Sequence, residues 1–282
     1  MKKALILIPL GLLIMLIGFG AFDYEINEAL FNRESRFGLI MIYAPYLTAY
    51  ILAYAAIMLV LRFMLLVRVK SYVPAFTATF ALFLMITYFF IFSFNDKVRA
   101  PMWEVPIFLA GVLILSALLI RRIDKRNLLS FFKMASMYLF SFFMMKISVN
   151  LVKTIIYRVR FEYLRDASEF QPWYLPEFSI GSSHAINSFP SGHTASGAMI
   201  MVIVLIPIFI PKFKKLLIPL SLIAFGWSVA SAMGRIAIGK HYPSDTIFAM
   251  LMVYGIFLLA YKMTKTLFVV LDHNYSRPKP CE

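Results

Sequence analysis

Residues 189–194 carry the first side chain that can do chemistry, at the junction between a polar segment and a long apolar run. Their sequence is Phe-Pro-Ser-Gly-His-Thr. Such a junction is typical of a helix that begins at a membrane surface, with Pro190 presetting the first turn and Ser191 capping it. The free N–H groups of a first turn bind anions, and Gly192 lets a ligand approach the backbone. We predict an anion site in which His193 exchanges a proton with the anion; a capped helix with an interfacial histidine is the alternative.

A second histidine, His241, precedes another predicted helix start. Pro243 is expected at the first helical position, so Asp245 falls in the first turn, four residues after the histidine. A carboxylate there can accept a hydrogen bond from a ring N–H, which leaves the other nitrogen as a nucleophile or base. Arg235 follows the preceding apolar run. Taken alone, this common spacing favours a structural role.

Cationic side chains recur along the apolar run 134–152 and its polar continuation. Lys146, Lys153 and Arg160 share one face if the helix continues through them, and the last two then converge on one anion. An ammonium such as Lys146 within the hydrocarbon marks a functional or water-lined interior by default. Snorkelling towards the interface is the alternative.

The composition places these residues in an integral membrane protein. The chain has 282 residues, of which 61% are hydrophobic, whereas a soluble domain is about half apolar. A separate soluble domain has no room. The single cysteine, Cys281, excludes an intrachain disulfide and a cysteine metal cluster, and no carboxylate cluster suggests a metal. We therefore expect neither a metal nor a cofactor.

The apolar runs predict an all-α, polytopic transmembrane helical bundle of about eight spans. They cover residues 4–22, 39–61, 74–94, 105–120, 134–152, 194–210, 216–233 and 246–261. The first run follows two lysines and resembles a signal peptide, but its length favours an uncleaved span.

The charges predict the orientation. With the N-terminus inside, the inner connections hold 17 basic and 3 acidic residues, and the outer connections hold 10 and 11. The positive-inside rule then places both termini in the cytoplasm, and we expect the protein in the cell (inner or plasma) membrane. The net charge of +14 faces anionic membrane lipid, so no nucleic-acid partner is expected.

Two outer loops carry structure of their own. Residues 23–38 have apolar side chains at helical spacing, which predicts a short interfacial helix; a plain loop is the alternative. The longest outer loop, 158–189, contains Trp173 and Tyr174 between prolines, a composition typical of a rigid piece at headgroup level and of a candidate substrate lid.

The charge count also places the three candidate stretches on one membrane face, the outer one. They bring together several fixed cations, one helix N-terminus and two histidines. This inventory suits phosphoryl transfer without a metal. Cations and N–H groups hold the non-bridging oxygens, one histidine attacks phosphorus, and the other protonates the leaving oxygen.

All three stretches resemble signature motifs of the type-2 phosphatidic-acid phosphatase superfamily of membrane lipid phosphatases. The family's motif K-x6-R-P is matched by Lys153 and Arg160, with Phe161 in the proline position. The motif P-S-G-H is matched in full at residues 190–193.

The third motif, S-R-x5-H-x3-D, is matched by Arg235, His241 and Asp245, with Gly234 in the serine position. The resemblance runs from the first motif to the end of the last span. Because the family core has six spans, one N-terminal pair looks extra. We therefore expect an N-terminal transmembrane region of about four spans, residues 1–127, and a catalytic core, residues 128–282.

The resemblance implies a role for each matched residue. His241 would be the nucleophile that forms a phosphohistidine, and Asp245 would orient it and stabilise the imidazolium. His193 would protonate the leaving oxygen and then activate water. The phosphoryl group would be bound by Lys153, Arg160, Ser191, Gly192 and Arg235.

The function implied is a membrane phosphatase acting on a lipid phosphate or pyrophosphate at the extracytoplasmic face. Undecaprenyl pyrophosphate, phosphatidylglycerophosphate, phosphatidic acid and lipid A phosphates are all candidate substrates. One alternative is a phosphotransferase that uses an acceptor other than water. Another is a non-catalytic scaffold or transporter with a relict site, which loss of a motif histidine would indicate; both histidines are present. The sequence predicts no oligomeric state.

Overall fold

The structure is a computed structural model that describes residues 2–67, 81, 83–88, 104–178 and 185–267. Helices make up nearly all of its regular structure. The two strands that these residues form, β1 (Ile156–Tyr157) and β2 (Glu177–Phe178), have two residues each and pair antiparallel. The predicted all-α class is confirmed.

The helices fall into long elements and short connecting turns. The α-helices are α1 (Lys2–Gly20), α2 (Asp23–Leu30), α3 (Arg36–Val67), α5 (Glu104–Arg121), α6 (Lys125–Ile155), α7 (Gly192–Ala198), α8 (Leu205–Phe209), α9 (Leu217–Ala237) and α10 (Pro243–Leu267). The 3-10 helices are η1 (Phe161–Tyr163), η2 (Ala167–Glu169), η3 (Met199–Val204) and η4 (Pro211–Leu216).

Five helical stretches of the described residues are long and apolar enough to cross a membrane. They are Arg36–Leu66, Lys125–Ile155, Gly192–Phe209, Pro211–Ala237 and Pro243–Lys265. Ile8–Gly20 and Asp23–Leu30, bent by 75° relative to each other, make a sixth if the pair is counted as one span. The predicted count of eight is therefore not confirmed, and the predicted span 74–94 falls mostly outside the described residues.

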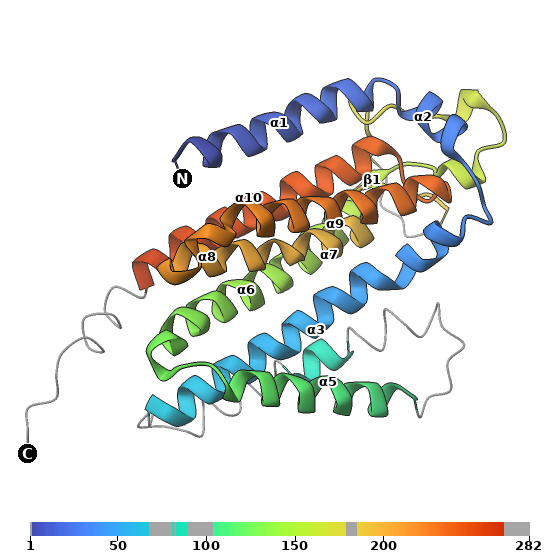
Figure 1. Cartoon of the computed structure of the whole chain (residues 1–282). Coiled ribbons are helices and arrows are strands. Elements are labelled where there is room, and N and C mark those ends of the chain that lie inside the picture. Colours follow the sequence, from blue (N-terminus) through green and yellow to red (C-terminus); the bar gives the residue numbers. More distant parts are fainter. Residues whose placement is uncertain (1, 68–80, 82, 89–103, 179–184, 268–282) are drawn as a thin grey trace, which may run out of the picture.

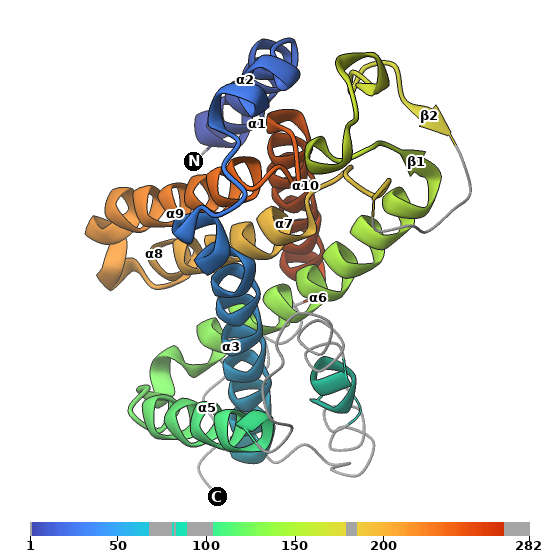
Figure 2. The ribbon, with the colours of Figure 1, turned by 90° about the vertical axis from the view of Figure 1, so that its right-hand side faces the viewer.

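The long helices lie side by side, and the two ends of the bundle differ in what they carry (Figure 1). The connection from α5 to α6 and the turn η4 lie at the end where α1 begins and α10 ends. Helix α2, the strand β1 and the segment after it lie at the opposite end, which faces the viewer in Figure 2. The predicted short helix in the first outer loop is confirmed by α2.

Helix α3 lies at the centre of the packing, against α5, α6, α7 and α9. Buried aromatic residues fill its contact with α6: the Tyr50 and Phe142 rings meet edge to face, and the Tyr138 hydroxyl donates to the Ala49 carbonyl at 2.7 Å. Between membrane helices, where lipid is as apolar as the core, association depends on such close packing and on interhelical hydrogen bonds.

Two helix boundaries differ from the sequence-based prediction. Helix α6 ends at Ile155 and the chain continues as the strand β1, so Arg160 does not share a helix face with Lys153 as predicted. Helix α9 continues to Ala237, four residues beyond the predicted end of that span, so Arg235 lies in its last turn.

Candidate active site

The segment with the first histidine forms the predicted helix start, with one shift in register. Helix α7 begins at Gly192, and Ser191 is its N-cap, because the Thr194 N–H donates to the Ser191 hydroxyl oxygen at 3.3 Å. The predicted cap is thus confirmed. Pro190 lies before the cap, after a cis peptide bond from Phe189, and not in the first turn as predicted.

His193 is therefore the second residue of α7 and is buried. Its ring packs against Tyr46 of α3, with the ring centroids 4.3 Å apart. The Tyr46 hydroxyl also lies 3.5 Å from where a Cβ on Gly192 would be. Helix α3 thus supplies a wall of the anion site that the motifs did not indicate.

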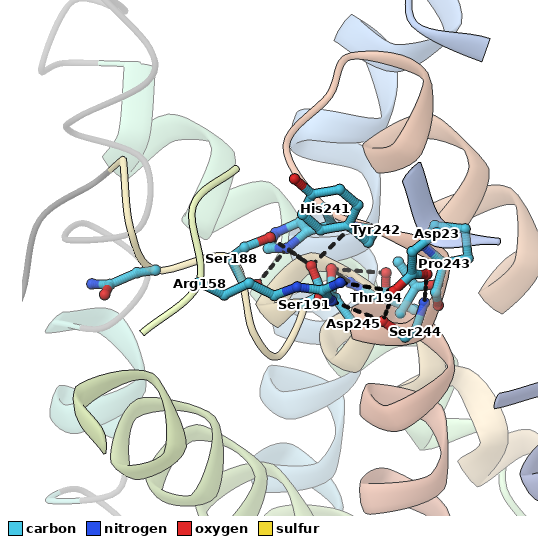
Figure 3. A network of polar contacts seen from close by, with 12 residues as sticks. Asp23, Arg158, Ser188, Ser191, Thr194, His241, Tyr242, Pro243, Ser244 and Asp245 are labelled. Carbon is cyan, nitrogen blue, oxygen red and sulfur yellow. Dashed lines mark hydrogen bonds and ion pairs between the residues drawn. The ribbon is translucent and has the colours of Figure 1, made fainter. Parts of the chain in front are cut away.

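His241 lies in the connection between α9 and α10, and only 2% of it is exposed. Its Nδ1 is 2.7 Å from the Ser188 carbonyl oxygen and 3.6 Å from Asp245 Oδ2 (Figure 3). Since a carbonyl can only accept, this contact assigns the proton to Nδ1 and leaves Nε2 without one. The predicted direct hydrogen bond to Asp245 is replaced by this carbonyl, because other donors occupy the carboxylate.

Those donors hold Asp245 from three sides. Its Oδ2 accepts from the Ser188 hydroxyl at 2.5 Å and from the Tyr242 N–H at 2.9 Å, and its Oδ1 accepts from Arg158 at 2.5 Å. Asp245 lies in the first turn of α10, which begins at Pro243 as predicted. The carboxylate therefore fixes the Ser188 segment, whose carbonyl in turn fixes the His241 ring.

Arg158, which the motifs did not indicate, is the cation at the centre of this network. Its guanidinium donates to Asp245, to Asp23 at 2.8 Å and to the Ser244 hydroxyl at 2.8 Å (Figure 3). The side chain is 2% exposed. These anions raise the pKa of the arginine above its ordinary value despite the opposing effect of burial, so the cation is permanent.

The position of Arg158 follows from an extended segment in place of the predicted helix. The Arg158 N–H donates to the Ile186 carbonyl and the Ser188 N–H donates to the Arg158 carbonyl, so the two stretches run together. The Arg160 N–H donates to the Ala185 carbonyl in the same way.

Three cations predicted to bind phosphate approach the histidines from different elements. Lys153, in the last turn of α6, donates from Nζ to the Asn187 carbonyl at 2.6 Å. Lys153 and Arg235 both act electrostatically on His241, and Arg160 and Arg235 both act on Tyr46. The structure therefore gathers these residues, with the two histidines, at one end of the bundle.

Arg235 is the cation best suited to hold an anion. It is 4% exposed, and within the described residues its Nε and Nη1 have no hydrogen-bond partner. Buried donors are normally paired, so two buried guanidinium N–H groups indicate a ligand with acceptor oxygens, such as a phosphoryl group.

The electrostatic setting suits a neutral nucleophile. Burial, reinforced by the cations Lys153 and Arg235, holds the pKa of the His241 imidazole well below 6.5, although Asp245 opposes this. The ring is therefore uncharged at neutral pH and its Nε2 lone pair is available.

Gly234, in the position of the family's serine, has a packing reason. A Cβ at Gly234 would lie 2.3 Å from Met41 Cβ of α3, closer than real Cβ contacts. A serine side chain has no space here, so the glycine lets α3 pack against α9, where Tyr46 reaches the site.

Among the described residues, no group of three His, Cys, Asp or Glu side chains is placed to hold a metal ion. The metal-free chemistry stays a prediction.

Comparison with known proteins bears on residues 131–268, which match the family model described as the PAP2 superfamily. All three motifs lie inside this segment. No curated protein and no solved structure matched the chain. The resemblance inferred from the motifs is confirmed: residues 131–268 match the PAP2 superfamily, the type-2 phosphatidic-acid phosphatases.

Proposed function

We propose that this protein hydrolyses a lipid phosphate or pyrophosphate through a phosphohistidine intermediate on His241. The observation that carries the proposal is the hydrogen bond between His241 Nδ1 and the Ser188 carbonyl oxygen at 2.7 Å. It leaves Nε2 as the nucleophilic atom of a neutral, buried ring. The match of residues 131–268 to the PAP2 superfamily supports a phosphatase-type activity.

In the first step, the Nε2 lone pair attacks phosphorus and the bond from phosphorus to the leaving oxygen breaks. His193 donates its proton to that oxygen. The phosphorylated ring carries a positive charge, which the Ser188 carbonyl and the Asp245 carboxylate stabilise. Ser188 and Asp245 are in place before the reaction, so little reorganisation is needed.

In the second step, His193 takes a proton from water, and the hydroxide attacks the phosphohistidine. The N–P bond breaks, inorganic phosphate leaves and His241 returns to its neutral state. The non-bridging oxygens are held by Lys153, Arg160, Arg235 and the N–H groups at the start of α7, with Ser191 and Gly192.

A cavity beside the network supports a lipid as the substrate. It has a volume of about 200 Å³ and is lined by Trp173, Phe189 and Phe248 next to Arg158. An apolar chain attached to a phosphate fits against these aromatic side chains, while the phosphate lies at the end of the bundle that carries the two histidines. A panel of candidate lipids then identifies the chain length and the headgroup that the protein accepts.

The test is phosphate release by the purified, detergent-solubilised protein across undecaprenyl pyrophosphate, phosphatidylglycerophosphate, phosphatidic acid and lipid A phosphates. We expect release from one class far above the others, an acid-labile and alkali-stable phosphoenzyme, and loss of both in His241→Ala. EDTA leaves the rate unchanged. Transfer of the phosphoryl group to an added alcohol acceptor, with no inorganic phosphate released in its absence, identifies a phosphotransferase, and absence of transfer, release and phosphoenzyme rejects catalysis.

A further inference from the structure

We propose that Asp23 and Asn27 of α2 are positioning residues for His241, which makes the first outer helix part of the active site. This inference rests on the proposed function, because the reaction assigned to His241 is the one proposed above. Both residues lie outside the segment that matches the PAP2 superfamily, and no motif includes them.

Asp23 holds the start of α10 from outside that helix. Its Oδ1 accepts from the Ser244 N–H at 2.8 Å, and its Oδ2 accepts from the Ser244 hydroxyl. The first N–H groups of a helix have no partner within it, and here a side chain 221 positions away in the chain serves as a cap. Ser244 precedes Asp245, so this cap fixes the backbone that carries the catalytic carboxylate.

The same carboxylate fixes Arg158, which links it to Asp245. Arg158 donates from Nη2 to Asp23 and from Nη1 to Asp245, and the Tyr242 ring lies 4.1 Å from the guanidinium carbon. Two carboxylates therefore share one buried cation. Without the charge of Asp23, the guanidinium is free to turn towards Asp245 alone, which disturbs the carboxylate that holds Ser188 and, through it, His241.

Asn27 holds the other side of the nucleophile. Its Nδ2 donates to the His241 backbone carbonyl at 3.2 Å. Asp23 and Asn27 are one helical turn apart and lie on the same face of α2. Helix α2 is therefore hydrogen-bonded to the chain at both His241 and Ser244.

The burial pattern of α2 indicates that its contacts with His241 and Ser244 hold the helix in place. The buried residues of α2 are Asp23 and Asn27, both polar, whereas Leu30 is 41% exposed. A helix held only by packing buries its apolar face. Here the polar residues are buried: Asp23 accepts from Ser244 at the start of α10, and Asn27 donates to His241 in the segment between α9 and α10.

The charged groups around His241 come from four elements. Asp245 of α10, Lys153 of α6 and Arg235 of α9 act on it directly, and Asp23 of α2 acts through Arg158. Removing the charge of Asp23 therefore displaces Asp245, an anion that opposes these cations. The stabilisation lost is that of the imidazolium formed in the phosphohistidine, so we expect kcat to fall more than KM rises.

The experiment compares Asp23→Asn with Glu28→Gln, which removes an exposed carboxylate from the same helix. Two readouts are taken on the full-length protein in detergent: kcat and KM on the best lipid of the panel, and ¹⁵N NMR of the imidazole rings. The chain has four histidines, and His241 is assigned by the loss of its signal in His241→Ala.

We expect the wild type and Glu28→Gln to show His241 as the Nδ1–H tautomer. In Asp23→Asn we expect a mixture of tautomers and a fall in kcat of about tenfold or more, the size seen when outer partners of an active-site group are removed, with KM changed by less than about twofold. Asn27→Ala, which keeps the buried charges, is expected to give the same change of tautomer in weaker form.

An Asp23→Asn protein with the wild-type tautomer overturns the proposal, whether its turnover is retained or lost. If Asp23→Asn does not fold, Asn27→Ala with an unaltered tautomer overturns it equally. If the wild type releases no phosphate while Asp23→Asn still alters the tautomer, the positioning role stands and the proposed function fails.

Discussion

The two histidines of the site have different neighbours. A carbonyl accepts from one nitrogen of His241, and the His193 ring packs against the Tyr46 ring at a tilt of 53°. A nucleophile needs one lone pair aimed at phosphorus. A group that gives and then takes a proton must switch states during turnover. The fixed tautomer of His241 suits the first task, and so we propose that His241 attacks; the P-S-G-H motif supports His193 for proton transfer.

Replacing each histidine separates these tasks. His241→Ala is expected to give no phosphoenzyme and no phosphate release. His193→Ala is expected to lower release by about 10²–10⁴-fold, the usual contribution of a general acid or base, and to lose less with a substrate whose leaving group needs no proton, such as p-nitrophenyl phosphate.

Rapid-quench trapping of the phosphoenzyme and steady-state phosphate release check both variants. His184→Ala, outside the three motifs, serves as the control and keeps its rate. A His193→Ala protein that forms the phosphoenzyme equally slowly from both kinds of substrate contradicts its role as the acid, because the later water-activating step is the same for both.

The burial of His241 predicts how activity depends on pH. Its pKa is depressed below 6.5, so the neutral, nucleophilic form persists as the pH falls through 6.5 and is lost only as the pH approaches the lower folded value. We expect kcat/KM to stay level as the pH falls through 6.5 and to decline only well below it. An acid limb centred above 6.5 contradicts this prediction.

The same depressed pKa of His241 makes the free energy of unfolding depend on pH in one direction. Below pH 6.5 the unfolded chain binds a proton at His241 that the folded chain does not bind, so the free energy of unfolding falls as the pH falls. The contribution is fully present above 6.5. Thermal unfolding of the wild type and of His241→Gln between pH 5 and 7 isolates it, and a wild-type curve parallel to that of the variant contradicts it.

At the scale of elements, the approach of α3 to α9 brings Tyr46 into the site. Gly38 and Gly234 lie where the two helices meet: a Cβ on Gly38 would lie 3.0 Å from the Gly234 carbonyl oxygen. Small residues at such contacts let helix backbones come close within a membrane. The site wall thus depends on glycines that do no chemistry.

Gly234→Ser restores the serine of the family motif but is expected to weaken this protein. The new Cβ would lie 2.3 Å from Met41 Cβ, and overpacking of this kind costs about 1–3 kcal/mol. We expect a lower unfolding temperature and no gain in phosphate release. Gly226→Ser is the matched control, since Gly226 lies on the same helix with nothing within 4 Å of its Cβ position. Faster turnover in Gly234→Ser at unchanged stability rejects this account.

The end of α6 shows where element-level prediction fails. Helical spacing predicted one face carrying Lys153 and Arg160, but the chain leaves the helix at Ile155 and pairs with residues 185–188. Helical periodicity is a local signal, so it does not indicate a pairing partner that is distant in the chain. The N-cap at Ser191 and the helix start at Pro243 were predicted correctly because both signals are local.

For the whole molecule, the sequence predicted the all-α class and the family, because composition and motif spacing determine both. It did not predict Asp23, Arg158 or Tyr46 at the site. In the sequence, Asp23 is one charge in a predicted interfacial helix, and its contact with Ser244 spans 221 positions. Charged and aromatic residues recur throughout a membrane protein, so a pairing of this kind has no signal until the helices are placed.

The arrangement of the whole bundle predicts its orientation in the membrane. The turn η4 and the segment that carries η2 lie at opposite ends (Figure 1), and the basic excess belongs to the end with η4. We expect the η2 end, with the active site, to face away from the cytoplasm.

In a Cys281→Ser background, Ser168→Cys in η2 is then labelled by a membrane-impermeant maleimide in intact cells. Lys212→Cys in η4 is labelled only after permeabilisation; both positions are exposed. Since the two cysteines test both ends, the reversed pattern moves the active site to the cytoplasmic face, and equal labelling of both in intact cells contradicts a bundle that crosses the membrane.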